Sequence, residues 1–208
     1  MASIRRKEIP DQEIQSFWEW FETIAADLGR DLENQAILEE LDRRVSELGD
    51  VSWEVGPGRK EENALVITPD GSKEQLATTQ RIVARAPMIP CWEFHWARPA
   101  RTWSLQFSID SDQGGRTQVD ARSWRYVLFR FPDQTFDVVL EQSNLKEASE
   151  SDRYTAAVVL LDGILGELKR LELIGGIEAV AALPEDQATK ASPIESLSMH
   201  LESLVAKP

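Results

Sequence analysis

Three side chains that can take part in catalysis alternate within one short segment: Cys91, Glu93 and His95. A cysteine nucleophile needs a base within hydrogen-bond reach, and histidine is the usual base. Alternation along a strand would place the three side chains on one face, but four residues of strand separate Cys91 from His95 by about 13 Å. That distance is too long for proton transfer. We therefore predict no Cys–His pair, but a small buried Cys91 and a partly exposed His95.

The same face lacks the ligands that a metal ion needs. Glu93 and His95 supply two ligands, a zinc site needs three or four, and the second histidine of the chain is His200, near its end. The sequence contains no Cys-x-x-Cys, His-Glu-x-x-His or EF-hand pattern, and the Gly-Pro-Gly turn at 56–58 lacks the Lys and Ser/Thr of a phosphate loop. We therefore expect no metal site and no cofactor.

Two carboxylates interrupt an apolar helical stretch late in the chain. Asp162 and Glu167 lie close to Gly163 and Gly166. A buried carboxylate needs a partner. The candidate partners are Arg98, Arg101 and Arg125. A structural ion pair is the favoured interpretation, ahead of a catalytic acid or base.

The seven tryptophans are unusual for a chain of 208 residues. Those in predicted strands are Trp53, Trp92, Trp96, Trp103 and Trp124. Trp18 and Trp20 lie on adjacent faces of the first predicted helix. The simplest interpretation is a sheet whose inner face packs aromatic side chains against helices. Trp20 would then point toward solvent or an interface, where tryptophan favours binding.

Periodicity predicts the elements that position these residues. Apolar residues recur every three or four positions over 11–28, 32–48, 72–86 and 151–173, which predicts helices, with a short helical piece at 177–183. A period of two predicts strands at 51–55, 63–68, 91–96, 103–109, 124–131 and 135–142. We predict an α+β fold: a mostly antiparallel sheet of about six strands, covered on one face by an N-terminal helical hairpin, a middle helix and a C-terminal helix.

Length and composition predict one main domain. We expect a single α+β domain over 1–183, a linker rich in Ala, Pro and polar residues at 184–193, and a C-terminal helix over 194–208. In that last segment Ile194, Leu197, Leu201 and Leu204 recur at helical steps. The pattern is too short for a coiled coil, so the helix is expected to dock on its own domain or on a partner.

The charge of the chain excludes several classes of partner. It has 36 acidic and 23 basic residues, a formal net charge of −13 at pH 7. Such a surface repels phosphate, so neither nucleic acid nor an anionic membrane is expected to bind. The chain has one cysteine, and its start shows no secretory signal. We therefore expect a reducing, cytoplasmic location.

The basic residues are not spread evenly. Arginines gather with the tryptophan-rich strands, at Arg98, Arg101, Arg122, Arg125 and Arg130. Acidic residues dominate the predicted helix at 33–47. We therefore expect an aromatic, locally basic sheet set against acidic helices, so that a negatively charged segment of a partner could also meet the sheet.

Four motifs occur together: WEVGPG at 53–58, NALVITPDG at 63–71, APMIPCWEF at 86–94 and LDGILGE at 161–167. Their order and spacing, over residues 14–178, resemble an uncharacterised family of bacterial cytoplasmic proteins, some of them encoded near secretion or toxin-immunity loci. The order of elements and the acidic composition also resemble the type III secretion chaperone-like fold, although the chain is longer and has extra strands. The resemblance implies a class of protein and no catalytic residues.

We therefore predict a non-enzymatic protein that binds a protein or peptide, in a chaperone-like or immunity-like role, with its acidic charge favouring a basic partner. The candidate ligand-binding residues are Trp20, Trp53, Glu54, Asn63, Trp92, Glu93, His95, Trp103 and Arg125. One alternative is a hydrolase or other enzyme using Glu54, Glu93, His95 or Asp162 in a cleft near Asn63. The other is an oligomeric structural protein, such as a homodimer, formed through the helix at 194–204.

Overall fold

The computed structural model describes residues 9–206, whose contacts group into two compact units, Met1–Arg98 and Pro99–Pro208. Each unit has its own core. The main core cluster of unit 1 draws its buried residues from Ile14 to Trp92, and that of unit 2 from Ile109 to Leu201. The division after Arg98 differs from the single domain that we expected over 1–183, because periodicity marks apolar faces without saying which of them pack together.

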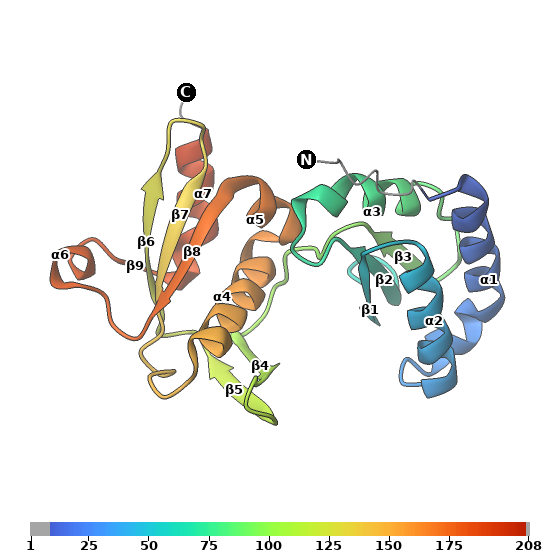
Figure 1. The fold of residues 1–208 in the computed structure, drawn as a ribbon, viewed down its shortest axis with the longest axis horizontal. Helices are drawn as coiled ribbons and strands as arrows, with labels where there is room; N and C mark the ends of the chain where they lie inside the picture. The colour runs from blue at the N-terminus through green and yellow to red at the C-terminus, as the bar shows by residue number, and fades with distance from the viewer. Residues whose placement is uncertain (1–8, 207–208) are drawn as a thin grey trace, which may run out of the picture. The chain divides into compact units, whose positions relative to one another are not determined.

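Unit 1 is a small sheet with helices, coloured blue to green in Figure 1. Its elements are α1 (Asp11–Arg30), α2 (Gln35–Glu47), β1 (Ser52–Pro57), β2 (Asn63–Thr68), η1 (Lys73–Gln75), α3 (Leu76–Val83) and β3 (Trp92–His95). The strand order is β1-β2-β3. The β1–β2 pair is antiparallel, whereas β2 and β3 are parallel and α3 lies in the connection between them. Every residue of β2 is buried, as expected for the central strand.

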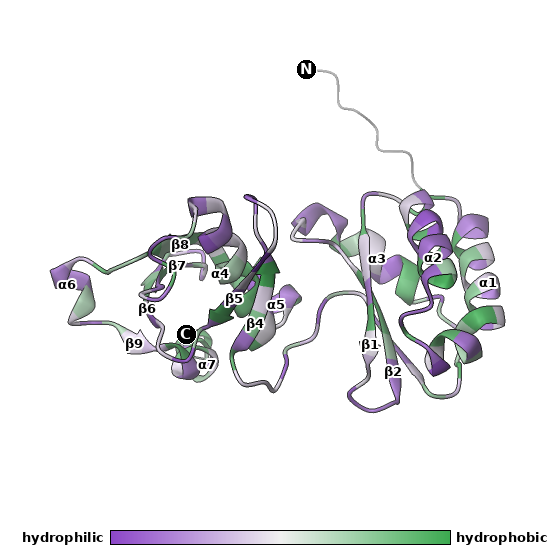
Figure 2. Cartoon of the chain, turned by 90° about the horizontal axis from the view of Figure 1, so that it is seen from below, coloured by the Kyte–Doolittle hydropathy of each residue, from purple (hydrophilic) through white to green (hydrophobic). Residues whose placement is uncertain are grey.

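The core of unit 1 is aromatic and is tied to the helices by indole hydrogen bonds. Figure 2 shows α1 with one hydrophobic and one hydrophilic side. Trp18 donates from Nε1 to the carbonyl oxygen of Ile82 at 2.8 Å, and Trp92 donates to that of Ala25 at 3.0 Å. Both bonds are buried, so the two largest side chains of this core also satisfy their polar atoms. The predicted aromatic packing of helix against sheet is present here.

Unit 2 holds the remaining sheets, drawn from light green to red in Figure 1. Its strands are β4 (Gln106–Asp110), β5 (Arg116–Asp120), β6 (Arg125–Arg130), β7 (Phe136–Glu141), β8 (Ile174–Val180) and β9 (Ser192–Pro193). Its helices are α4 (Glu150–Leu165), α5 (Glu167–Leu173), α6 (Glu185–Ala188), η2 (Ile194–Ser196) and α7 (Leu197–Val205). A two-stranded sheet pairs β4 with β5, and a four-stranded sheet has the order β8-β7-β6-β9.

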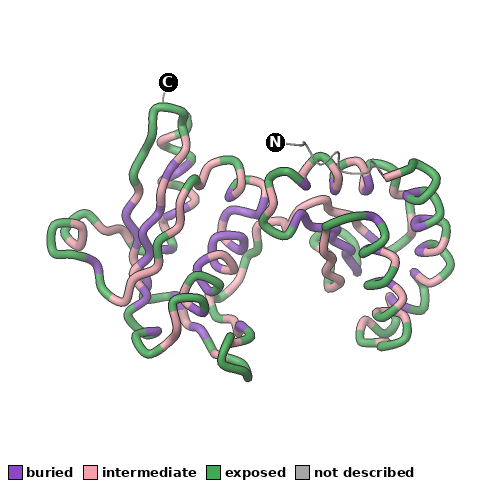
Figure 3. Tube along the Cα trace, in the orientation of Figure 1, coloured by how far each residue is buried: buried purple, intermediate pink, exposed green. Residues whose placement is uncertain are grey.

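One face of the four-stranded sheet packs against helices of its own unit. Phe136, Val138 and Leu140 of β7 are buried in the same cluster as residues of α4 and α7. Figure 3 shows buried residues along β7 and α4. The helix at the end of the chain therefore docks on its own unit, through Ile194, Leu197 and Leu201, each at most 1% exposed.

The α+β class is confirmed, but the single predicted sheet is wrong. Among residues 9–206 there are nine strands in three sheets. The stretch 177–183, predicted to be helical, lies mostly in β8, because pairing with β7 overrides its weak helical period. The strand β5 was missed, since its residues are mostly polar. The expected linker at 184–193 contains α6 and β9, and β9 pairs with Arg125 and Tyr126 of β6.

Candidate binding site

Glu93 holds a loop together. Its carboxylate lies on β3 and accepts hydrogen bonds from three successive backbone amides of the β1–β2 connection, those of Arg59 (2.7 Å), Lys60 (2.9 Å) and Glu61 (3.3 Å). His95 contributes a fourth contact, with its Nε2 at 3.0 Å from Glu93 Oε1. The structure therefore brings the predicted Glu93 and His95 side chains together, in an arrangement that fastens the hairpin to the neighbouring strand.

The electrostatics of Glu93 fit this anchoring role. Burial raises the pKa of Glu93, but hydrogen bonds from the loop amides and His95 lower it by a larger amount, so that the pKa falls to about 2. A carboxylate that stays ionised and saturated with donors is poorly suited to exchange protons near pH 7. The Glu93–His95 pair therefore stabilises unit 1, and the observed geometry gives no support to the hydrolase alternative.

Cys91 differs from the prediction. Its side chain is exposed and its backbone has a φ of 67°, so the residue lies in a turn just before β3. The negative charge of Glu62 raises the pKa of the Cys91 thiol, and desolvation adds to the effect. A thiol with a raised pKa is a weak nucleophile at neutral pH. The prediction that Cys91 is buried was wrong, because the strand begins one residue later than expected.

The other candidate residues of unit 1 have structural partners. Trp20 is half-buried, and the guanidinium of Arg44 lies 4.6 Å from its ring centroid. Trp53 donates from Nε1 to Asp42 at 3.1 Å. Asn63 is buried beside Trp92, its partner in the strand register. Trp20, expected to face solvent or an interface, is thus covered in part by its own chain.

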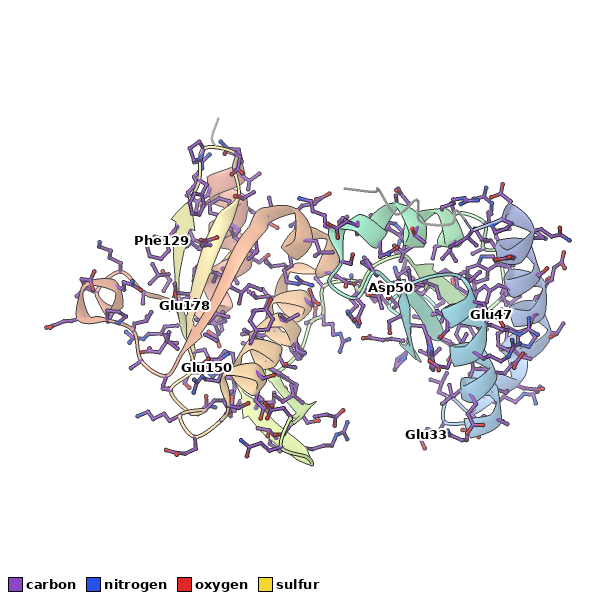
Figure 4. The ribbon with its side chains drawn as sticks, in the orientation of Figure 1. Glu33, Glu47, Asp50, Phe129, Glu150 and Glu178 are labelled. Carbon is purple, nitrogen blue, oxygen red and sulfur yellow. The ribbon has the colours of Figure 1, made fainter. Side chains whose placement is uncertain are left out.

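Three of the five arginines expected to make a basic sheet, Arg98, Arg122 and Arg125, form ion pairs with carboxylates. Arg98 binds Glu54 at 2.6 Å and Asp70 at 3.1 Å. In unit 2, Arg122 pairs with Asp120 in the same way. These pairs offset the positive charge of Arg98 and Arg122 beside the strands. The acidic character of α2 and its ends is retained, with Glu33, Glu47 and Asp50 exposed (Figure 4).

The partner of Asp162 is none of the three arginines expected from the sequence. It forms a buried ion pair with Arg170, and both residues are at most 7% exposed. The two positions face each other because α4 ends at Gly166, which has a φ of 80°, and α5 turns back from there. The predicted structural ion pair of Asp162 is therefore present, but the arginine that forms it lies only eight residues further along the chain.

The two unit 2 candidates also serve the fold. Trp103 packs against the backbone at Gly163, where a Cβ atom would overlap its ring. Arg125 on β6 donates to Glu141 on β7 at 2.6 Å and reaches the carbonyl oxygen of Ala188 at 3.4 Å. Arg125 therefore fastens the segment 181–191 over one end of the sheet.

That segment covers only part of the second face of the four-stranded sheet. Residues on this face form three cross-strand rows: Arg125–Glu141–Val180, Val127–Val139–Glu178 and Phe129–Asp137–Gly176. The first row is tied to the segment through Arg125, and Leu183 packs on the two valines of the second. The third row lies beyond it. The polar and aromatic surface at that end is therefore open.

The open end is a groove of about 620 Å³. We call it the aromatic–acidic groove and define it by Phe129, Phe131, Asp137, Gly176, Glu178 and Gln187. Phe129 and Phe131 are each 42% exposed. Figure 4 labels Phe129 and Glu178, which come from the strands on either side of β7. None of these residues was among the sequence candidates. The available signal was the apolar run at 127, 129 and 131, on the face of β6 opposite Tyr126.

A second pocket, of about 580 Å³, lies in unit 2 and includes Ser111, Ser149 and Asp152. These three residues are hydrogen-bonded to one another. Asp152 accepts from Ser111 Oγ at 2.7 Å and from the Asp112 amide at 3.0 Å, and its own amide donates to Ser149 Oγ at 3.0 Å. The Ser149 bond caps the start of α4, and the two bonds to the Asp152 carboxylate hold the β4–β5 connection against that helix.

No protein-family model, curated protein or solved structure matches the chain. The resemblance based on the four motifs therefore stays a prediction. Within residues 9–206, no group of three or more His, Cys, Asp and Glu side chains is placed to hold a metal ion. None of the helices in that range is both long and apolar enough to cross a membrane.

Proposed function

We propose that this protein is a non-enzymatic binding protein that receives an extended segment of a protein partner in the aromatic–acidic groove. The observation that carries the proposal is the pair Phe129 and Phe131, both 42% exposed on the open part of the sheet face. A single exposed apolar residue is normal on a protein surface, whereas two neighbouring aromatic rings in a groove are typical of an interaction site.

The edge of the sheet next to the groove supports an extended ligand. The short strand β9 pairs only with Arg125 and Tyr126. Within the described residues, no strand pairs with 127–130 on that side of β6. An extended peptide that continues the line of β9 would bond to this free edge and place alternate side chains over the groove. We propose a chaperone-like or immunity-like role in the cytoplasm for such a protein.

Selection of peptides tests the proposal. Random twelve-residue peptides displayed on phage are selected on the full-length protein, and the enriched peptides are measured by fluorescence anisotropy. Burying the exposed 42% of each ring is worth about 1 kcal/mol. The double variant Phe129→Ser/Phe131→Ser should therefore weaken binding by about tenfold to thirtyfold.

A matched control separates the groove from general surface effects. Tyr154 and Met199 are also exposed apolar residues of unit 2, at 52% and 71%, and do not line the groove. The variant Tyr154→Ser/Met199→Ser should bind as the wild-type protein does. Enrichment of no peptide, or equal binding by the two double variants when both show wild-type circular dichroism, overturns the proposal.

A further inference from the structure

One hydrogen-bond acceptor in the aromatic–acidic groove has no donor. The side-chain oxygen of Gln187, on α6, is buried and has no hydrogen-bond partner within residues 9–206. Gln187 lines the groove together with Asp137 and Glu178. A buried acceptor that has lost its water and found no donor is destabilising, and a ligand that brings an N–H group removes that penalty.

The two carboxylates of the groove also lack a counter-charge. Among the described residues, neither Asp137 nor Glu178 forms a hydrogen bond or ion pair through its side chain. Glu141, one cross-strand row away from Glu178 on the same face, is paired with Arg125. Within the described part of the chain, Glu141 is therefore paired with a cation, whereas Asp137 and Glu178 on the same face are not.

Gly176 helps to place one of these carboxylates. It is the β8 neighbour of Asp137 in the strand register, and a Cβ atom at Gly176 would lie 2.6 Å from Asp137 Oδ1. The Asp137 side chain therefore leans across the space that a larger residue would fill. This contact orients the carboxylate over β8, the strand that also carries Glu178.

The rings and the overall charge favour the same kind of ligand. The face of an aromatic ring attracts a cation within roughly 6 Å of its centroid. The chain carries a net charge of −13, which speeds the approach of a basic partner. One cation, Arg130, also lines the groove, but its guanidinium is bonded to Gln134 of the β6–β7 turn.

We propose that the groove is specific for a lysine- or arginine-bearing segment of a partner protein, whose cationic head donates to Asp137, Glu178 and the Gln187 side-chain oxygen while its alkyl stem lies on Phe129. This inference rests on the proposed function and names the chemistry of its ligand. A positively charged head satisfies three acceptors at once, whereas a neutral apolar segment would leave them unpaired.

The test uses three labelled peptides that differ only in charge. Each is a ten-residue extended peptide of alternating threonine and a variable residue, which is lysine, glutamine or glutamate. Binding to the full-length protein is measured by fluorescence anisotropy at 50 mM and 500 mM salt. The lysine peptide should bind at least tenfold more tightly than the glutamine peptide, and its affinity should fall at high salt.

Variants assign the preference to the groove. Asp137→Asn/Glu178→Gln keeps the shape of both side chains and should reduce the advantage of lysine over glutamine to about twofold or less. The control is Glu185→Gln, which removes one charge from α6 outside the groove. Gln187→Leu should weaken binding of the lysine peptide about threefold to tenfold without lowering the melting temperature of the free protein, since it removes an unpaired acceptor.

The outcomes distinguish this inference from the proposed function. If all three peptides bind equally well and the Phe129→Ser/Phe131→Ser variant weakens all of them, peptide binding stands and the cationic specificity is overturned. The same conclusion follows if the glutamate peptide binds best, or if Glu185→Gln has the effect of the groove variant. If neither these peptides nor the displayed peptides bind, the proposed function itself fails.

Discussion

Replacing Glu93 by glutamine tests whether one ionised carboxylate holds the β1–β2 connection in place. Glutamine has the same shape, but it has no charge and presents an NH₂ group to loop amides that are themselves donors. The pKa of Glu93 is lowered from its ordinary value of 4.5 to about 2, and the side chain is only 11% exposed. At about 1.4 kcal/mol for each pKa unit, the ionised form contributes about 3 kcal/mol to the free energy of unfolding.

The contribution has a defined pH dependence. Because the folded-state pKa lies below the ordinary value, the stabilisation is complete above about pH 5 and is lost as the pH falls from about 4.5 toward 2. By pH 3 the contribution falls by about 2 kcal/mol. The difference in unfolding free energy between the wild-type protein and Glu93→Gln should therefore be about 3 kcal/mol at pH 7 and about 1 kcal/mol at pH 3.

Urea unfolding followed by tryptophan fluorescence measures this difference, since five of the seven tryptophans lie in unit 1. Hydrogen exchange of the Arg59 and Lys60 amides reports on the loop directly and should accelerate in the variant. Glu61→Gln is the control, because it removes a charge from the same loop and keeps the backbone bond to Glu93. A difference below about 0.5 kcal/mol at pH 7, or one of equal size at pH 7 and pH 3, would refute the reasoning.

Two further predictions concern buried charge and thiol reactivity. Asp162→Asn should lower the free energy of unfolding of unit 2 by about 3–5 kcal/mol, because it leaves the buried Arg170 without its carboxylate partner. The double variant Asp162→Asn/Arg170→Met should lose less stability than the sum of the two single variants. Additive losses in urea unfolding would argue against the ion pair. Because Glu62 raises the pKa of the Cys91 thiol, alkylation by iodoacetamide at pH 8 should be slower than for free cysteine, and Glu62→Gln should accelerate it by about two- to fivefold. An unchanged rate in that variant would show that Glu62 does not control the thiol.

Local pattern predicted much of the fold. The helices expected at 11–28 and 32–48 correspond to α1 and α2, and the strand expected at 63–68 is β2. The hairpin expected over 124–142 is the β6–β7 pair. These elements have strong periods and clear turn signals, which neighbouring residues create without help from the rest of the chain.

The candidate site was harder to predict, because it depends on what a residue meets far away in the sequence. Glu93 was predicted to bind a ligand, or to act in catalysis in the enzyme alternative, whereas its carboxylate accepts hydrogen bonds from three amides of residues 59–61. Arg125 looked like a ligand-binding cation and instead binds Glu141. Phe129 and Phe131 were not among the candidates, since nothing local in the sequence shows that the segment 181–191 leaves them exposed.

The sequence by itself determined the α+β class, the position of most helices and strands, the aromatic core of unit 1 and the excess of negative charge. Only the tertiary structure decided how the strands divide into three sheets, which carboxylates gain a partner and which part of a sheet face stays open. The physical reason is range: periodicity and turns arise between neighbours in the chain, whereas burial, ion pairing and pKa depend on groups that only the folded chain brings within a few ångströms.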